Sequence, residues 1–169
     1  MLKVPLFKQK YNNSCGITAL RMVLSFYGMN VSENKIIKGV GGLKKYGIRA
    51  IRLAEFARSL GFKTKTFSVN KKLADSLTQI KKPDIRYVLK YLGREIPVIL
   101  NVRYSLLYNK KPTKEGHFIV VSGHKKNYFW YNDPENAKVR KVEANHLKLA
   151  WIKNAFDSSA YLLIVYRNE

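Results

Sequence analysis

The chain has 169 residues, 46% of them hydrophobic and 12% aromatic, and it carries a formal net charge of +21. This length and composition exclude a disordered chain and predict a single domain over residues 1–169 with a substantial core. Its apolar runs are much shorter than the roughly 20 residues of a membrane span, and its N-terminus lacks the apolar stretch of a signal peptide.

Helical spacing dominates the first half of the chain. Apolar residues recur on one face from Ile17 to Tyr27, and Gly28 follows, which predicts a helix over 15–27. Ser14 or Asn13 can cap its first turn. The same signals predict further helices over 32–38, 48–60 and 84–92, and alternating residues predict strands over 2–7 and 62–69.

Strand patterns dominate the second half. A polar turn at 124–126 separates two apolar runs, which predicts a β-hairpin. The polar, irregular stretch 104–115 predicts a mobile loop. The strands expected here cover 97–102, 118–122, 127–132, 139–142 and 161–166. Helices followed by strands are typical of an α+β fold, here with N-terminal helices packed on a mainly antiparallel sheet.

Cys15 is the only cysteine, so the chain cannot form an internal disulfide, and we expect a reducing, cytoplasmic setting. Its thiol lies at the predicted start of a helix. Unpaired backbone N–H groups and the helix dipole there favour the thiolate and lower the pKa of a cysteine. The alternative is a small buried apolar residue, which is the more common role of a lone cysteine in an apolar helix.

His117 is the strongest candidate for a base beside this thiol. If the hairpin turn is centred near Lys125, paired residues have numbers that sum to about 250, which places His117 opposite Asp133. Opposed residues have Cβ atoms roughly 4.5–5.5 Å apart, so Asp133 could orient the imidazole through a hydrogen bond. A register slip of one residue would instead set His117 against Asn132 or Pro134.

The other two histidines and Gln9 are the remaining candidates for polar groups of the site. His124, in the predicted turn, and His146, at a predicted surface helix start, are interpreted as ordinary solvated histidines. Gln9 lies six residues before Cys15, and its amide could donate a hydrogen bond to an oxyanion formed at that thiol. The backbone N–H of Cys15 could donate a second.

Three motifs together resemble a known family. They are Gln9 followed after five residues by Cys15-Gly16, then GHFIVVSG at 116–123, then NDP at 132–134. This combination resembles the papain-like cysteine peptidases, and more narrowly the bacteriocin-processing peptidases, which cleave leader peptides after a double glycine. The resemblance extends between the motifs, at 53–62 and 96–100, and so covers nearly the whole chain.

The resemblance implies a papain-like fold and a role for each motif residue. Cys15 would be the nucleophile, His117 the general base and then acid, Asp133 the orienting residue and Gln9 an oxyanion donor. Ser14 departs from the family, where an acidic residue commonly precedes the cysteine. The transporter segments of fused members do not follow, so we expect a free-standing peptidase-like domain. Gly41-Gly42 is interpreted as a flexible loop rather than a self-processing site.

The function expected from these features is a thiol-dependent peptidase acting on peptide or protein substrates, with no metal or cofactor. The net charge of +21 also indicates contact with anionic partners. Because lysine doublets are spread along the chain, we interpret them mainly as a solvated basic surface. The alternatives are a basic module that binds nucleic acid or acidic peptides, and an acyl transferase on the same fold. Substrate sequence and oligomeric state stay open.

Overall fold

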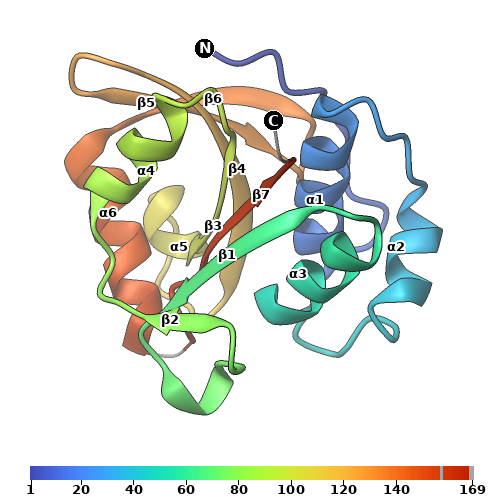
Figure 1. Cartoon of the computed structure of the whole chain (residues 1–169). Helices are drawn as coiled ribbons and strands as arrows, with labels where there is room; N and C mark the ends of the chain where they lie inside the picture. The colour runs from blue at the N-terminus through green and yellow to red at the C-terminus, as the bar shows by residue number, and fades with distance from the viewer. Residues whose placement is uncertain (157, 168–169) are drawn as a thin grey trace.

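A seven-stranded sheet forms the centre of the structure, a computed structural model that describes residues 1–156 and 158–167 (Figure 1). The strands are β1 (Lys63–Ser68), β2 (Thr78–Ile80), β3 (Val98–Arg103), β4 (Gly116–Lys125), β5 (Tyr128–Asp133), β6 (Lys138–Glu143) and β7 (Leu162–Tyr166). Their spatial order is β2-β1-β7-β3-β4-β5-β6. Only the β1–β2 neighbours in this sheet are parallel, so the expected mainly antiparallel α+β fold is confirmed.

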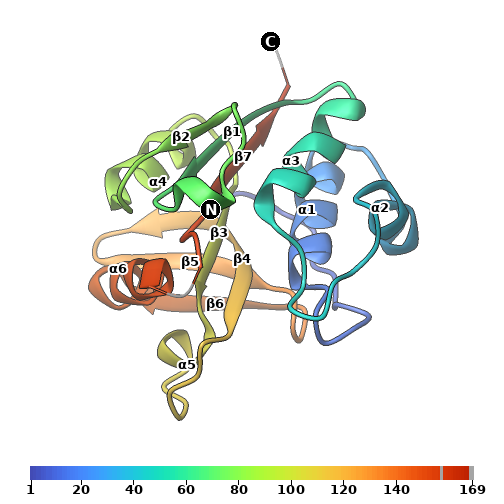
Figure 2. The same ribbon diagram turned by 90° about the horizontal axis from the view of Figure 1, so that it is seen from below.

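Helices cover both faces of this sheet (Figures 1 and 2). They are α1 (Cys15–Phe26), α2 (Glu33–Gly39), α3 (Ala50–Ser59), α4 (Ile85–Leu92), α5 (Tyr104–Leu107) and α6 (Ala144–Lys153), with 3-10 turns at Lys71–Leu73 and Asn154–Phe156. The first three helices lie on one side, and α4, α5 and α6 lie on the other. None of the described helices is long and apolar enough to cross a membrane.

Alternating strand residues fill two separate cores. Ile99 and Leu163 pack under α1 and α3, whereas their neighbours Leu100 and Leu162 pack under α4 and α6. Successive side chains of a strand point to opposite faces, so a sheet covered on both faces needs continuous apolar strands. The runs VIL in β3 and LLIV in β7 meet this need.

Two predicted elements differ from the structure. Residues 2–7 do not form a strand, although Leu2 N–H donates to Ser122 O at 2.7 Å, because Pro5 has no N–H to continue a ladder. The predicted loop 104–115 begins with the short helix α5, where Ser105 and Leu107 are buried. The other predicted helices and strands lie within a few residues of their expected ranges.

Gly16 lets α1 approach β4 closely. A Cβ built there would lie 2.8 Å from Ile48 Cγ2 and 2.9 Å from Phe118 Cδ2. We expect Gly16→Ala to lower the free energy of unfolding by about 1–3 kcal/mol, since both neighbours must shift. Urea denaturation measures this, with Gly93→Ala as the control, because Gly93 has φ −65° and a Cβ there would lie no closer than 3.3 Å to its nearest neighbour, Leu89 O. Equal midpoints for the two variants would contradict the close packing.

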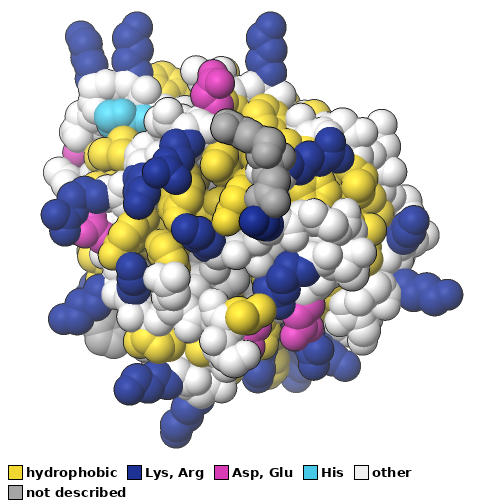
Figure 3. Space-filling model, viewed as in Figure 1, with side chains coloured by type: hydrophobic (Ala, Val, Ile, Leu, Met, Phe, Trp, Pro, Cys, Tyr) yellow, Lys and Arg dark blue, Asp and Glu magenta, His cyan; other side chains and the backbone are white. Residues whose placement is uncertain are grey.

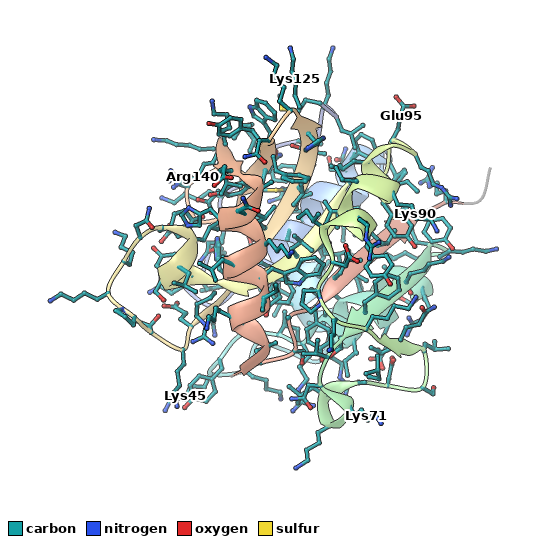
Figure 4. All side chains as sticks on the ribbon, turned by 90° about the vertical axis from the view of Figure 1, so that its left-hand side faces the viewer. Lys45, Lys71, Lys90, Glu95, Lys125 and Arg140 are labelled. Carbon is teal, nitrogen blue, oxygen red and sulfur yellow. The ribbon has the colours of Figure 1, made fainter. Side chains whose placement is uncertain are left out.

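Basic side chains are distributed over the surface. On the face shown in Figure 3, lysine and arginine surround apolar areas and project from most of the rim. In Figure 4, Lys45, Lys71, Lys90 and Lys125 lie at four separated positions. On these faces the charge is therefore dispersed rather than gathered into one basic patch.

Candidate active site

The segment that leads to Cys15 is held by buried polar contacts. Ser14 is fully buried, and its Oγ lies 2.5 Å from Glu33 Oε1, which also accepts the Lys10 N–H at 3.1 Å. The sequence offered Ser14 or Asn13 as the helix cap. Ser14 holds the capping position but its hydroxyl makes no capping bond, and the Asn13 amide donates to Lys44 O instead. The Ser14 backbone (φ −103°, ψ 15°) lacks the extended conformation that a capping residue adopts, so the hydroxyl turns to Glu33.

Cys15 is the first residue of α1, and its surroundings favour the thiolate. Burial by itself raises the pKa of the thiol, but a hydrogen bond with His117 and the imidazolium charge outweigh it. Backbone N–H groups of Phe118 and Gly16 add to this, so the pKa of Cys15 lies below its usual value. The helix start predicts a Cys15 thiolate, and the contacts with His117 and Phe118 of β4 favour that thiolate as well.

The structure brings His117 and Asp133 together by a different route from the predicted one. Imidazole Nε2 lies 3.0 Å from Asp133 Oδ1. The strands β4 and β5 pair as Lys125↔Tyr128, shift register near Ser122, and end at Val120↔Asn132, so the expected direct opposition is wrong. The turn is centred between Lys126 and Asn127, later than the predicted Lys125, and a bulge then moves the register again, so the two side chains meet diagonally on one face of the sheet.

His117 is buried, and its neighbours stabilise the imidazolium. Burial by itself lowers its pKa, but hydrogen bonds and charge from Asp133 and Cys15 raise the pKa of His117 to about 10. Since Asp133 takes Nε2, the other ring nitrogen, Nδ1, is left for the thiol. The rings of Tyr104 and Tyr108 pack edge-on against the imidazole, with centroids 5.6 and 5.9 Å away.

Asp133 is a fully buried carboxylate with donors on both oxygens. Its Oδ1 also accepts the Glu135 N–H at 3.0 Å, and its Oδ2 accepts the Tyr108 hydroxyl and Arg140 Nε, both at 2.8 Å. Burial by itself raises the pKa of Asp133, but these donors, led by His117, lower it to about 2. Asp133 is therefore ionised across the physiological range.

Gln9 lies beside this site, but its amide is engaged within its own loop. Its backbone N–H donates to Pro134 O at 2.7 Å, next to Asp133. Its Nε2 donates to the carbonyls of Tyr11 (2.9 Å) and Asn12 (3.1 Å), while Oε1 is buried with no hydrogen-bond partner among the described residues. In this arrangement both amide hydrogens hold the loop.

The other two histidines make contacts of their own. His124 lies at the exposed end of β4, with its ring 4.6 Å from that of Phe129. His146 Nε2 contacts Leu106 O at 2.6 Å, so it joins α6 to α5 and is not simply solvated. Within the described part of the chain, no group of three or more His, Cys, Asp or Glu side chains is placed to hold a metal ion.

Sequence reasoning missed four residues around the site: Glu33, Tyr104, Tyr108 and Arg140. Tyr104 and Tyr108 are four residues apart, a spacing that puts two side chains on the same face of a helix. This spacing could have indicated a short helix within the predicted loop. Arg140 lies among lysines in β6, and Glu33 opens α2 as an ordinary first-turn acid. The local sequence gives neither of them a signal.

Two shallow grooves border the segment before Cys15. One has a volume of about 430 Å³ and is lined by Lys8, Lys10, Arg21 and Glu33, among others. The other, of about 390 Å³, includes Tyr11, Ile37 and Leu43 in its lining.

Comparison with known proteins decides the family. The sequence profile of the Peptidase C39 like family matches residues 1–159. The chain belongs to this family. A curated relative, the SPbeta prophage-derived sublancin-168-processing and transport ATP-binding protein SunT of Bacillus subtilis, is 23% identical over 137 residues, which are 80% of this chain and 16% of the relative. The chain therefore spans only about a sixth of the curated relatives it matches.

Solved structures of peptidase domains share the fold. The peptidase domain of Streptococcus ComA, a bifunctional ABC transporter, has a TM-score of 0.69 and 21% identity, covering 98% of this chain and 99% of that one. A double glycine motif protease from an AMS/PCAT transporter, solved in complex with the leader peptide, has a TM-score of 0.62 and 22% identity, covering 99% and 94%. The expected family and fold are thus confirmed.

Proposed function

We propose that this C39-like chain is a cysteine peptidase in which Cys15, His117 and Asp133 act together. The observation that carries the proposal is the buried His117 imidazole, which lies 3.0 Å from the Asp133 carboxylate and lowers the pKa of the Cys15 thiol. A nucleophile, a base and an orienting group in this order are what covalent acyl chemistry requires. We further propose that residues 1–169 work as one peptidase-like domain.

In the first half of the reaction, the Cys15 thiolate attacks the carbonyl carbon of the scissile peptide. The carbonyl oxygen becomes an oxyanion, which the first-turn N–H of Cys15 can stabilise. Gln9 supplies a second donor once its amide turns away from Tyr11 or Asn12. The imidazolium of His117 then gives its proton to the departing amine, and a thioester remains on Cys15.

In the second half, water releases the acyl group. Neutral His117 takes a proton from the water as its oxygen attacks the thioester carbon, and the Cys15 sulfur leaves as thiolate. The carboxylic acid departs, and the thiolate–imidazolium pair is restored. An amine in place of water would make the same site an acyl transferase.

We propose a peptide substrate, cleaved after Gly-Gly in a leader segment. The support is a structural neighbour, a double glycine motif protease solved in complex with the leader peptide, and a relative named for sublancin processing. The basic surface would recruit acidic segments of such a substrate, and the single unpaired cysteine suits the cytoplasm. The peptidase is favoured over a binding module because a basic surface alone needs no half-buried cysteine beside a buried His–Asp pair.

Alkylation tests the proposal cleanly, because Cys15 is the only thiol in the chain. Native protein and protein fully alkylated with iodoacetamide are incubated with a peptide library that includes Gly-Gly leader sequences. We expect cleavage by the native protein and none after alkylation. Equal cleavage by the two samples, or none by either, would contradict the proposal, and salt-sensitive binding of polyanions without cleavage would favour the binding module.

A further inference from the structure

The Asp133 oxygen that His117 does not contact is held by two side chains from different elements. Tyr108 follows α5 and donates its hydroxyl to Oδ2 at 2.8 Å. Arg140, in β6, donates Nε to the same oxygen at 2.8 Å. The carboxylate is fully buried, while the Arg140 side chain is 37% exposed and lies beside α6 in Figure 4.

Tyr108 contacts three ionisable groups of the site: Asp133, His117 and Arg140. Its ring packs edge-on against His117, and the Arg140 guanidinium lies 5.3 Å from its ring centroid. The tyrosine thus joins the imidazole, the carboxylate and the guanidinium in one packed unit.

We propose that Tyr108 and Arg140 are positioning residues: by holding Oδ2 they fix the plane of the Asp133 carboxylate and aim Oδ1 at His117 Nε2. This inference rests on the proposed peptidase function. An aspartate carboxylate rotates in a broad, shallow well about its last torsion, so its orientation must come from its partners. Two anchors from separate elements prevent that rotation, and they act on catalysis only through His117.

The charges around the unit alternate, which makes it sensitive to pH. The Cys15 thiolate faces the His117 imidazolium, which faces the Asp133 carboxylate and then the Arg140 guanidinium. From the surrounding elements, Glu135 accepts the Tyr104 hydroxyl at 2.8 Å, and Glu115 and Tyr131 lie near the tyrosines. Loss of a donor to Asp133 raises the pKa of its carboxyl group. The carboxylate that pairs with the imidazolium is then protonated at a higher pH than in the native protein.

Tyr108→Phe tests the positioning role, because it keeps the ring and removes only the hydroxyl. We expect kcat to fall about ten-fold with little change in KM, and the acid limb of Cys15 alkylation to move about one pH unit toward neutral. The matched control is Tyr161→Phe, which also loses a buried hydroxyl bond, to the Leu73 carbonyl, in the other core. It should lose stability without changing either profile.

A substitution at Arg140 gives a second test. It should disturb folding less than one at Tyr108, because the Arg140 side chain is partly exposed to solvent. Arg140→Gln should shift the alkylation profile as Tyr108→Phe does, and Arg140→Lys should recover part of the difference. The exposed Arg52→Gln is the control. Alkylation needs no peptide, so an altered profile in a protein that cleaves nothing would support positioning and refute the peptidase. Unchanged profiles and unchanged kcat in folded variants would overturn the positioning role.

Discussion

Cys15→Ala is expected to lower kcat for peptide cleavage by about 10³-fold or more, because no other group can carry the acyl intermediate. The chain has no second thiol to substitute for it. Alanine removes only the sulfur, from a position already half-buried at the start of α1, so the fold should be retained. Cleavage of a leader peptide, followed by mass spectrometry, measures the loss.

The control for Cys15→Ala is Cys15→Ser, which keeps a nucleophilic atom at the same place. The pKa of a serine hydroxyl is far above that of a thiol. The serine of Cys15→Ser therefore would not ionise beside His117, and activity should stay low. Thermal unfolding of both variants should resemble that of the native protein. Native-like cleavage by a folded Cys15→Ala protein would refute the acyl-enzyme mechanism.

Asp133→Asn is expected to lower kcat by about 10²- to 10⁴-fold, because it removes the anion that orients and charges His117. The pKa of His117, about 10 in the native protein, should fall, since Asp133 raises it. The imidazolium is needed to protonate the leaving amine, so the alkaline limb of kcat against pH should move toward neutral. The pH profile of cleavage measures this shift.

Asp133 also predicts how stability depends on pH. Its pKa is about 2 in the folded protein, below the roughly 3.9 of an unfolded aspartate. Its contribution, about 2–3 kcal/mol, is therefore fully present above about pH 4 and is lost as the pH falls through 2. The stability difference between native protein and Asp133→Asn should shrink over that range. A difference that stays constant from pH 7 to pH 2 would contradict the ionised, paired carboxylate.

The fold could be predicted because its signals are local. The spacing from Ile17 to Tyr27 gave α1, and the apolar runs of β3, β4 and β7 gave the central strands. The strand expected at 2–7 does not form. A short alternating pattern does not show whether a neighbouring strand can pair with it, and Pro5 lacks the N–H that such pairing needs. The polar pattern of residues 104–115 predicts a loop. It does not reveal α5, because the burial of Leu107 depends on tertiary contacts with α6 and the sheet.

The pairing of His117 with Asp133 was expected for a reason that was only partly right. Both residues do lie on neighbouring antiparallel strands, and their side chains do meet. The register depended on the turn and on a bulge near Ser122, which local sequence does not reveal. Arg140 and Glu33 could not be found at all, because their roles come from distant partners, Asp133 and Ser14.

The central claim is that a thiolate at the start of α1 is paired with an imidazolium supplied by β4. The rate of Cys15 alkylation by iodoacetamide, measured from pH 4 to pH 10 in the native protein and in His117→Ala, tests it most directly. The native thiol should react well below pH 8.5, the value of a free cysteine. In His117→Ala the reaction should move to a higher pH, because the two largest contributions that oppose burial, the hydrogen bond and the charge of His117, are lost. Superimposable profiles for the two proteins would contradict the pairing.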